Sequence, residues 1–220
     1  MIAPQTFTGD EELQIETGNV YVVDDDCAVC QSIELMVRAM GLPIHAFSSA
    51  EQFLKTMTIE PHGCLITDVR LLGMSGLQLL KEIADHQWEL SSIVVTGYGD
   101  VRLAVESFKA GAFTFLEKPY REQELWEAIV QALAKSQTLV DGRKFKQHVR
   151  SCLSKLTPEE TDVLRELLQS TPLKTIAVKL NFSLRTIDLR RRNILDKFKV
   201  DSKIELTRMI IAAGIAIDEI

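Results

Sequence analysis

Residues 19–30, NVYVVDDDCAVC, place a short β-branched and aromatic run directly before three consecutive aspartates. The run predicts a buried strand, and the segment from Cys27 onward shows a helical periodicity that closes at Gly41. A strand that passes directly into a helix is the first half of a βαβ unit. The stretch therefore predicts an α/β domain whose first strand ends in a group of carboxylates.

The alternation of strand and helix patterns continues along the first part of the chain. A later helical pattern closes at Gly111 as the first does at Gly41, and a fifth helix is expected near residues 121–136. The strands are expected at residues 19–24, 43–47, 63–68, 92–96 and 112–117. Strands that alternate with helices in this way predict a parallel sheet.

Polar side chains mark the carboxyl ends of these strands. Asp24 and Asp25 follow the first strand, Asp68 ends the third, Thr96 ends the fourth and Lys118 follows the fifth. The carboxyl edge of an open α/β sheet is where ligands bind. Because the three carboxylates of residues 24–26 would repel one another at that edge, a hard divalent cation with oxygen ligands is their natural partner. The pattern predicts an acidic pocket that binds such an ion.

An alternative interpretation rests on Cys27 and Cys30, because a Cys-x-x-Cys spacing beside a βαβ unit can mark a redox site. The acidic pocket already accounts for this neighbourhood, so we expect the cysteines to pack as small hydrophobic residues. With Cys64 and Cys152 they are too few and too scattered for a disulfide framework, which favours a reducing compartment. The first 18 residues show neither a basic leader nor an apolar segment, so a cytoplasmic protein without membrane contact is expected.

Three stretches together resemble the receiver domain of two-component response regulators: VYVVDDD (20–26), CLITDVRLLGMSGLQLL (64–80) and IVVTGYGDVRLAVESFKAGAFTFLEKPY (93–120). The resemblance covers residues 18–136. It implies a flavodoxin-like (βα)5 fold, and a sensor histidine kinase as the partner that supplies a phosphoryl group.

The resemblance also implies a role for individual residues. Asp68 is expected to be the phosphoacceptor, with Lys118 pairing with one phosphoryl oxygen and the Thr96 hydroxyl donating to another. Phe115 is expected to be the aromatic switch that moves as the threonine moves. Leu72 stands where the family often has proline, which leaves the rigidity of that loop open.

Mg²⁺ is the metal ion that the resemblance implies. Asp25, Asp68 and the backbone carbonyl of Arg70 are its expected ligands, with Asp24 acting through water. Asp26 is an outer acidic neighbour without a ligand role.

The second part of the chain differs in charge and in pattern. Residues 1–137 hold 9 basic and 20 acidic side chains, whereas residues 138–220 hold 16 and 11. Residues 137–152 are polar and basic, which predicts a linker that can continue the fifth helix. Four helical patterns follow, one starting with a capping box at Thr157 and another with Ser183 as its N-cap. A basic, all-helical part indicates a nucleic-acid partner.

The third of these helices has two distinct faces. One face is spaced for packing, and the other is spaced i, i+3, i+4, i+7. The packing face holds Ile187, Ile194 and Phe198, and the other holds Arg185, Asp188, Leu189 and Arg192. A basic helix that follows a short helix and a turn predicts a helix-turn-helix recognition helix.

Residues 156–168, LTPEETDVLRELL, and 174–206, KTIAVKLNFSLRTIDLRRRNILDKFKVDSKIEL, resemble the LuxR-type DNA-binding domain, which we assign to residues 153–220. The resemblance implies that Asp188, Leu189 and Arg192 face base edges, although the family usually has a basic residue where Asp188 stands. The expected contacts to phosphate are Arg190, Arg191, Lys174 and Lys179.

The two resemblances together point to a response regulator of the FixJ-like group. They imply a transcription factor, not an enzyme, that forms a homodimer on phosphorylation and binds double-stranded promoter DNA, with RNA polymerase as a further candidate partner. A receiver whose helical domain binds a protein remains open as the alternative. The run Arg190–Arg192 could then be an ordinary solvated helix face.

Overall fold

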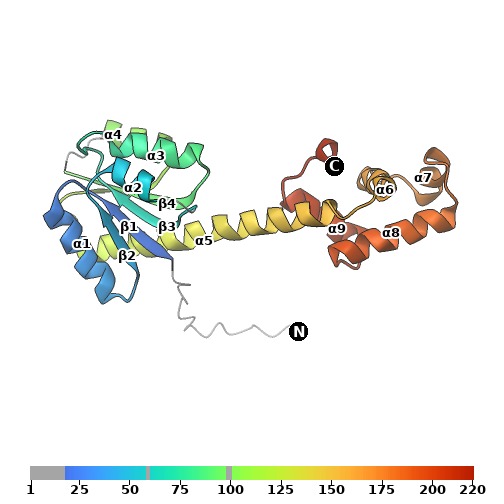
Figure 1. Ribbon diagram of the computed structural model, residues 1–220, viewed down its shortest axis with the longest axis horizontal. Coiled ribbons are helices and arrows are strands. Elements are labelled where there is room, and N and C mark those ends of the chain that lie inside the picture. The colour runs from blue at the N-terminus through green and yellow to red at the C-terminus, as the bar shows by residue number, and fades with distance from the viewer. Residues whose placement is uncertain (1–17, 58–59, 98–100) are drawn as a thin grey trace, which may run out of the picture. The chain divides into compact units, whose positions relative to one another are not determined.

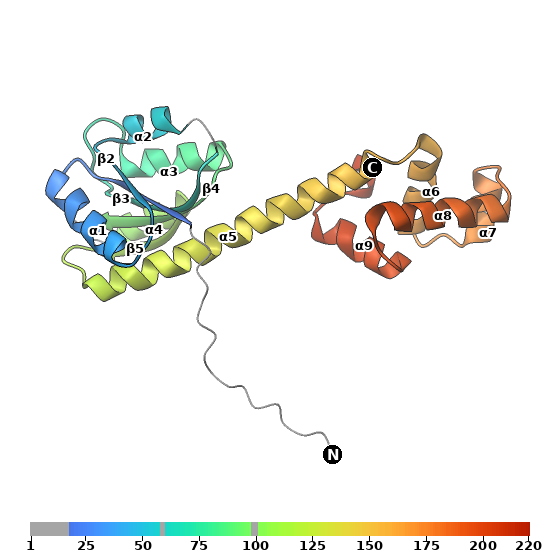
Figure 2. The ribbon, with the colours of Figure 1, turned by 60° about the horizontal axis from the view of Figure 1, so that its bottom comes forward.

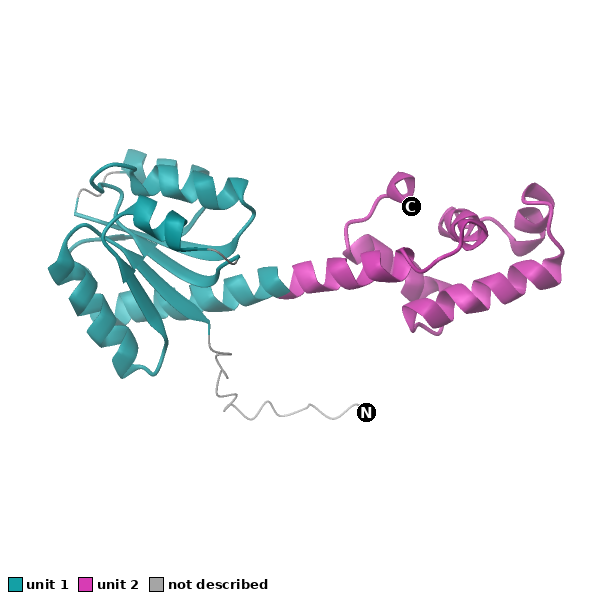
Figure 3. Ribbon diagram, viewed as in Figure 1, with its two compact units in different colours: residues 1–140 teal, residues 141–220 magenta. Residues whose placement is uncertain are grey.

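A computed structural model describes residues 18–57, 60–97 and 101–220 (Figure 1). The expectation that the N-terminus carries no leader concerns residues 1–17, which lie outside the described residues. The chain divides into two compact units, residues 1–140 and 141–220 (Figure 3). Across the described ranges, every helix is too short or too polar to span a membrane.

The sheet of the first unit has five parallel strands in the order β2-β1-β3-β4-β5. The strands are β1 (Asn19–Val23), β2 (Ile44–Phe47), β3 (His62–Thr67), β4 (Glu89–Thr96) and β5 (Ala112–Glu117). The helices are α1 (Cys27–Ala39), α2 (Ala50–Thr56), α3 (Gly76–Asp85), α4 (Val101–Lys109) and α5 (Glu122–Leu153). This strand order confirms the predicted flavodoxin-like (βα)5 fold.

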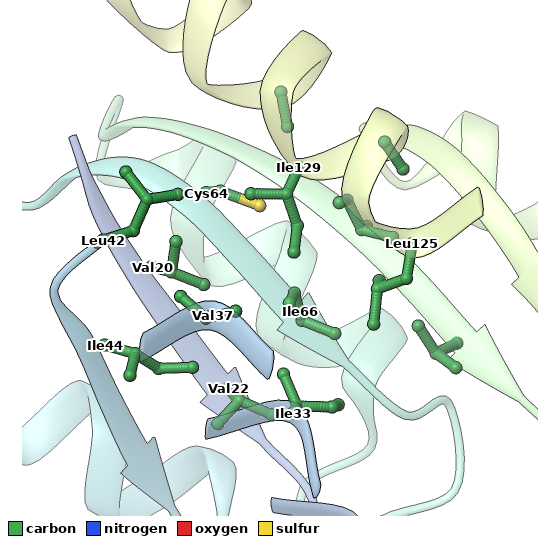
Figure 4. Packing of buried hydrophobic residues seen from close by; sticks show 14 of the residues in the cluster. Val20, Val22, Ile33, Val37, Leu42, Ile44, Cys64, Ile66, Leu125 and Ile129 are labelled. Atoms are coloured by element: carbon green, nitrogen blue, oxygen red, sulfur yellow. The ribbon is translucent and has the colours of Figure 1, made fainter. Parts of the chain in front are cut away.

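Helices cover both faces of the sheet, with α1 and α5 on one side and α2 and α3 on the other (Figure 2). Val22 of β1 packs in the cluster that α1 and α5 complete, in which Figure 4 shows Ile33 and Leu125. The next residue along the strand, Val23, packs instead with Phe53 of α2. Because both faces are buried in this way, a ligand can reach the sheet only at the strand ends.

One strand is longer than its sequence pattern indicates. β4 begins at Glu89, three residues before the expected start at Ser92. Its register with β3 runs without a break from the pair His62 and Glu89 onward, and Ser91 and Ser92 are both buried. Pairing with β3 thus draws polar residues into a strand that local propensity does not predict.

The fifth helix is also longer than expected, because α5 continues through residues 137–152 as far as Leu153. This segment is rich in glutamine, lysine and arginine, which all have high helix propensity, and Gly142 is its single glycine. The predicted linker is therefore helical along its whole length.

The predicted helix boundaries are confirmed at four positions. Gly41 and Gly111 have φ angles of +77° and +102°, in the left-handed region that glycine tolerates after a helix. Thr157 forms a capping box at the start of α6, and the Ser183 side chain accepts a hydrogen bond from a backbone N–H in the first turn of α8. Local capping chemistry therefore sets these ends.

The second unit contains four helices and a short 3₁₀ helix around a separate hydrophobic core. They are α6 (Pro158–Leu168), α7 (Leu173–Lys179), α8 (Leu184–Phe198), α9 (Lys203–Ala212) and η1 (Ile217–Glu219). The end of α5 contributes Val149 to this core, and α8 contributes Ile187, Ile194 and Phe198, as its spacing predicted. The all-helical, four-helix fold is confirmed, and the opposite face of α8 is left to solvent.

Candidate functional site

Asp24, Asp68 and Lys118 meet at the carboxyl edge of the sheet. Asp24 follows β1, Asp68 follows the adjacent β3, and Lys118 follows β5. The Lys118 ammonium donates hydrogen bonds to Asp24 Oδ2 and to Asp68 Oδ2, each at 3.0 Å. Residues up to 94 positions apart in sequence therefore form one hydrogen-bonded group.

This group has two carboxylates for one ammonium, and little of it is open to water. The side chains of Asp24, Asp68 and Lys118 are 7%, 14% and 25% exposed. Burial alone would lower the pKa of Lys118, but the hydrogen bonds and charges of the two aspartates outweigh burial and raise that pKa above its ordinary value. Lys118 is thus fully protonated at neutral pH. Because it neutralises only one of the two carboxylate charges, the group favours binding of a second cation.

The three aspartates of residues 24–26 do not gather at one point, which corrects the expectation from their adjacency. Asp24 is buried, Asp25 is exposed, and Asp26 is the N-cap of α1, where its side chain accepts from the Ala28 N–H at 2.8 Å. The Asp26 N–H also donates to Asp24 Oδ1 at 2.9 Å. Because α1 begins at Cys27, the Asp26 side chain accepts from a free backbone N–H of the first helical turn. Of the three aspartates, only Asp24 pairs with Lys118.

The oxygen donors at this edge suit Mg²⁺. In the described part of the chain, no group of three or more His, Cys, Asp or Glu side chains stands at metal-ligand spacing. Mg²⁺ commonly binds through one or two carboxylates and keeps several waters, so the pair Asp24 and Asp68 suits it, and the expected ligand Asp25 directly follows Asp24 in the sequence. The backbone of Arg70 also lies beside this pair, because its N–H donates to Asp68 Oδ1 at 3.0 Å.

A residue that the sequence analysis missed restrains the loop after Asp68. Glu51, in the first turn of α2, accepts a hydrogen bond from the Met74 N–H at 2.7 Å. Gly73 approaches the same carboxylate so closely that a Cβ there would stand 2.6 Å from Glu51 Oε1. Glu51 therefore ties α2 to the loop that contains Leu72. No local signal indicates this contact, because its partners are 23 residues apart.

Thr96 and Phe115 lie on neighbouring strands, β4 and β5. Thr96 is fully buried at the end of β4, and its backbone carbonyl accepts from the Lys118 N–H at 2.8 Å. Phe115 is partly buried against a small cluster that includes Val69 and Val94. The Lys118–Pro119 peptide bond is cis. Both expected switch residues therefore stand close in the sheet, and their motion stays a prediction.

The two cysteines of the Cys-x-x-Cys segment differ in environment. Cys30 is buried, and its thiol donates to the Asp24 carbonyl at 3.4 Å. Burial, and then the charge of Asp24, raises the pKa of the Cys30 thiol to about 11. A thiol that stays protonated is a poor nucleophile, which argues against the redox interpretation. The expectation of cysteines packed as hydrophobic residues is confirmed for Cys30 and wrong for Cys27, which is exposed at the first position of α1.

The outward face of α8 carries the residues expected to meet base edges. Arg185, Leu189 and Arg192 are exposed, and Asp188 lies between them, partly exposed. The Asp188 carboxylate accepts from Arg191 Nη2 at 3.0 Å and from Arg192 Nη2 at 2.6 Å. Burial acts to raise the pKa of Asp188, but these two guanidinium groups outweigh it and lower that pKa. The i, i+3 and i, i+4 spacing of these residues was the sequence signal for both pairs.

The basic residues expected at phosphates differ in how far other groups engage them. The Arg190 guanidinium lies 4.6 Å from the centre of the Phe182 ring and 3.4 Å from a carboxylate oxygen of Glu159. Lys179 pairs with a glutamate of α6, whereas Lys174 is exposed on α7. A phosphate contact by Arg190 or Lys179 would therefore exchange an internal partner for the phosphate.

Comparison with known proteins matches both units to described families. Residues 20–130 match the response regulator receiver domain, and residues 154–210 match the bacterial regulatory proteins of the luxR family.

Similar proteins match over nearly the whole chain. The transcriptional regulatory protein FixJ of Azorhizobium caulinodans is 39% identical over 197 residues, which covers 90% of this chain and 93% of that protein. FixJ of Rhizobium meliloti is 37% identical over 198 residues, covering 89% and 96%. The low-resolution structure of the response regulator StyR matches with a TM-score of 0.78 and 32% identity, over 89% of this chain and 98% of that one. The chain therefore belongs to the two-component response regulators that join a receiver domain to a LuxR-type DNA-binding domain.

Proposed function

We propose that this response regulator is a transcription factor that a sensor histidine kinase activates by transferring a phosphoryl group to Asp68. The observation that carries the proposal is the position of Lys118, whose ammonium is 3.0 Å from both Asp24 and Asp68 at the ligand-binding edge of the sheet. An ammonium beside a nucleophilic carboxylate is placed to neutralise the charge of an incoming phosphoryl group.

The transfer needs little from the protein beyond position and charge. An Asp68 carboxylate oxygen attacks phosphorus, the bond from phosphorus to the kinase histidine nitrogen breaks, and that nitrogen keeps the electron pair. Lys118 stays beside the phosphoryl oxygens, and the Thr96 hydroxyl turns to donate to one of them. Asp24, Asp25, Asp68 and the Arg70 carbonyl would hold Mg²⁺, which supplies further charge neutralisation when bound.

Labelling with a small phosphodonor tests the acceptor. The full-length chain is incubated with radiolabelled acetyl phosphate and Mg²⁺, beside the variants Asp68→Asn and Asp85→Asn. We expect label on the parent and on Asp85→Asn, which changes an exposed aspartate at the end of α3. Asp68→Asn should stay unlabelled, because its amide cannot form the acyl phosphate. Label of parental strength on Asp68→Asn would refute the assignment.

We infer that activation pairs two copies of the receiver through α4. Val101, Val105 and Phe108 are exposed and recur at i, i+4 and i+7, so they form one apolar stripe. Arg102 and Glu106 beside the stripe carry opposite charges, which suits a two-fold interface in which each copy meets the same surface of the other. The proposed dimer brings two DNA-binding domains to neighbouring half-sites of a promoter, where RNA polymerase is a candidate partner. We propose that it acts in the cytoplasm, where it regulates transcription on DNA and turns over no substrate.

A second candidate function is a helical domain that binds a protein. The observation in its favour is that several basic side chains of this domain already have acidic partners, as Lys179 does on α6. Binding of the parent to mixed-sequence duplex DNA at two salt concentrations separates the two. A DNA-binding domain loses affinity steeply as salt rises, because phosphate contacts release counterions, and a protein-binding domain shows no duplex affinity to lose.

A further inference from the structure

We propose that Asp188 is a positioning residue for sequence recognition: it holds the Arg192 guanidinium in a defined orientation on the outward face of α8 and limits its contact with phosphates. The inference rests on the proposed DNA-binding function and adds the residue that sets its specificity. It also explains why an acidic residue stands on a face whose neighbours are basic.

Both oxygens of the Asp188 carboxylate are engaged. Oδ1 accepts from Arg191 at 3.0 Å, and Oδ2 accepts from Arg192 at 2.6 Å. A cytosine amino group, the base contact that an aspartate could otherwise make, would therefore have to share a carboxylate oxygen with one of the two arginines. Asp188 therefore acts on DNA through the arginines.

The exposure of the two partners suits this arrangement. The Arg192 side chain is 66% exposed and that of Asp188 is 30% exposed. The less exposed carboxylate therefore holds the arginine, and most of the arginine side chain stays accessible to DNA. A long arginine side chain loses rotamer freedom when it binds, and a carboxylate that orders it beforehand reduces that loss. The ordered guanidinium can then make a bidentate contact with a guanine edge.

The charge of Asp188 also acts against the wrong contacts. Contacts with phosphate carry no sequence information, and a free arginine on the helix surface makes them with any duplex. A carboxylate next to Arg191 and Arg192 repels phosphate and competes for both guanidinium groups, so it weakens binding to unrelated sequences more than binding to a site that Arg192 reads. Specificity is the difference between these two affinities.

The chain offers a matched control on the same helix. Asp196 is also an exposed aspartate of α8, and no ion pair joins it to either arginine among the described contacts. Asp188→Asn and Asp196→Asn thus remove the same charge from α8, and only Asp188→Asn weakens the hold on Arg191 and Arg192. Exposed ion pairs contribute little to folding, so both variants should fold.

The test measures discrimination. Full-length parent and both variants, treated with acetyl phosphate and Mg²⁺, bind a duplex selected by the parent from a pool with a randomised core, and separately a mixed-sequence duplex. We expect Asp188→Asn to bind the mixed duplex several-fold more tightly, with a salt dependence steeper by about one unit of slope. The ratio of the two affinities should fall about tenfold, the size of one well-made base contact. Asp196→Asn should keep the parental ratio.

The base preferences of each protein give a second measurement. If Asp188 only stabilised the fold, its replacement would leave these preferences unchanged. When the selection is repeated with Asp188→Asn, the selected duplexes should show no preference at one base pair in each half-site. In a protein that already carries Arg192→Ala, adding Asp188→Asn should leave the ratio of the two duplex affinities unchanged. Parental preferences and ratio in Asp188→Asn, or an equal loss in Asp196→Asn, would overturn the positioning role while DNA binding stands. A parent that selects no sequence would overturn the proposed function as well.

Discussion

At the scale of single residues, Lys118 allows two buried carboxylates to share the edge of the sheet. Lys118→Met keeps much of the aliphatic stem and removes the ammonium, so Asp24 and Asp68 lose their common partner. We expect the free energy of unfolding of the receiver to fall by about 3 kcal/mol at neutral pH, the low end for breaking a buried ion pair. Urea denaturation followed by tryptophan fluorescence measures it, because Trp88 and Trp126 both lie in the first unit.

The pH dependence of that loss identifies its cause. Because folding raises the pKa of Lys118, its contribution is complete below the ordinary pKa of 10.5 and is lost as the pH rises through the higher folded value. The stability difference between parent and Lys118→Met should stay constant between about pH 7 and about pH 9 and shrink only above the ordinary value. Lys81→Met, which changes an exposed lysine of α3, should show no difference. A difference that declines before pH 9 would assign the loss to another group.

At the scale of elements, Ser136 fixes α5 against the amino edge of the sheet. Its buried hydroxyl accepts from the Gly63 N–H at 2.7 Å and donates to the Glu89 carbonyl. Ser136→Ala removes both hydrogen bonds, so we expect the receiver to lose about 2 kcal/mol of stability, the combined net value of two such bonds. The same fluorescence measurement in urea applies. Ser151→Ala, at an exposed position of the same helix, should unfold at the parental urea concentration, and equal midpoints for all three proteins would remove this role from Ser136.

At the scale of the whole molecule, phosphorylation should shift an equilibrium toward a dimer, because a phosphoryl group can favour only the state that binds it better. Sedimentation with and without beryllofluoride and Mg²⁺ should show the parent mass doubling. Thr96→Ala should still accept phosphate at Asp68 but dimerise less, since the buried side chain that is expected to donate to the phosphoryl group is gone. Phe108→Ser should be labelled normally and stay monomeric. An unchanged parental mass would refute the dimer and favour release of an inhibitory contact within one chain.

Much of the fold could be predicted from local sequence, and so could the positions of Asp24, Asp68 and Lys118 at strand ends. The strand of residues 19–23 and the helix end at Gly41 follow from periodicity and capping within a few positions. The ion pairs of Asp188 could also be predicted from the sequence, since they join residues three and four positions apart. The extent of β4 was not, because Ser91 and Ser92 are strand residues only through their pairing with β3.

Short stretches of sequence were enough to predict the alternation of strands and helices, the predicted helix caps and the polar residues at the ends of four strands, because those features depend on neighbours within about one helical turn. Packing between elements instead decided which carboxylates share Lys118 and that Glu51 holds the loop after Asp68. These contacts join separate elements. In a parallel sheet, neighbouring strands are linked by crossover connections, so residues that meet at the sheet edge are far apart in the sequence. Which groups meet at the edge is therefore set by strand order and packing, which local patterns do not encode.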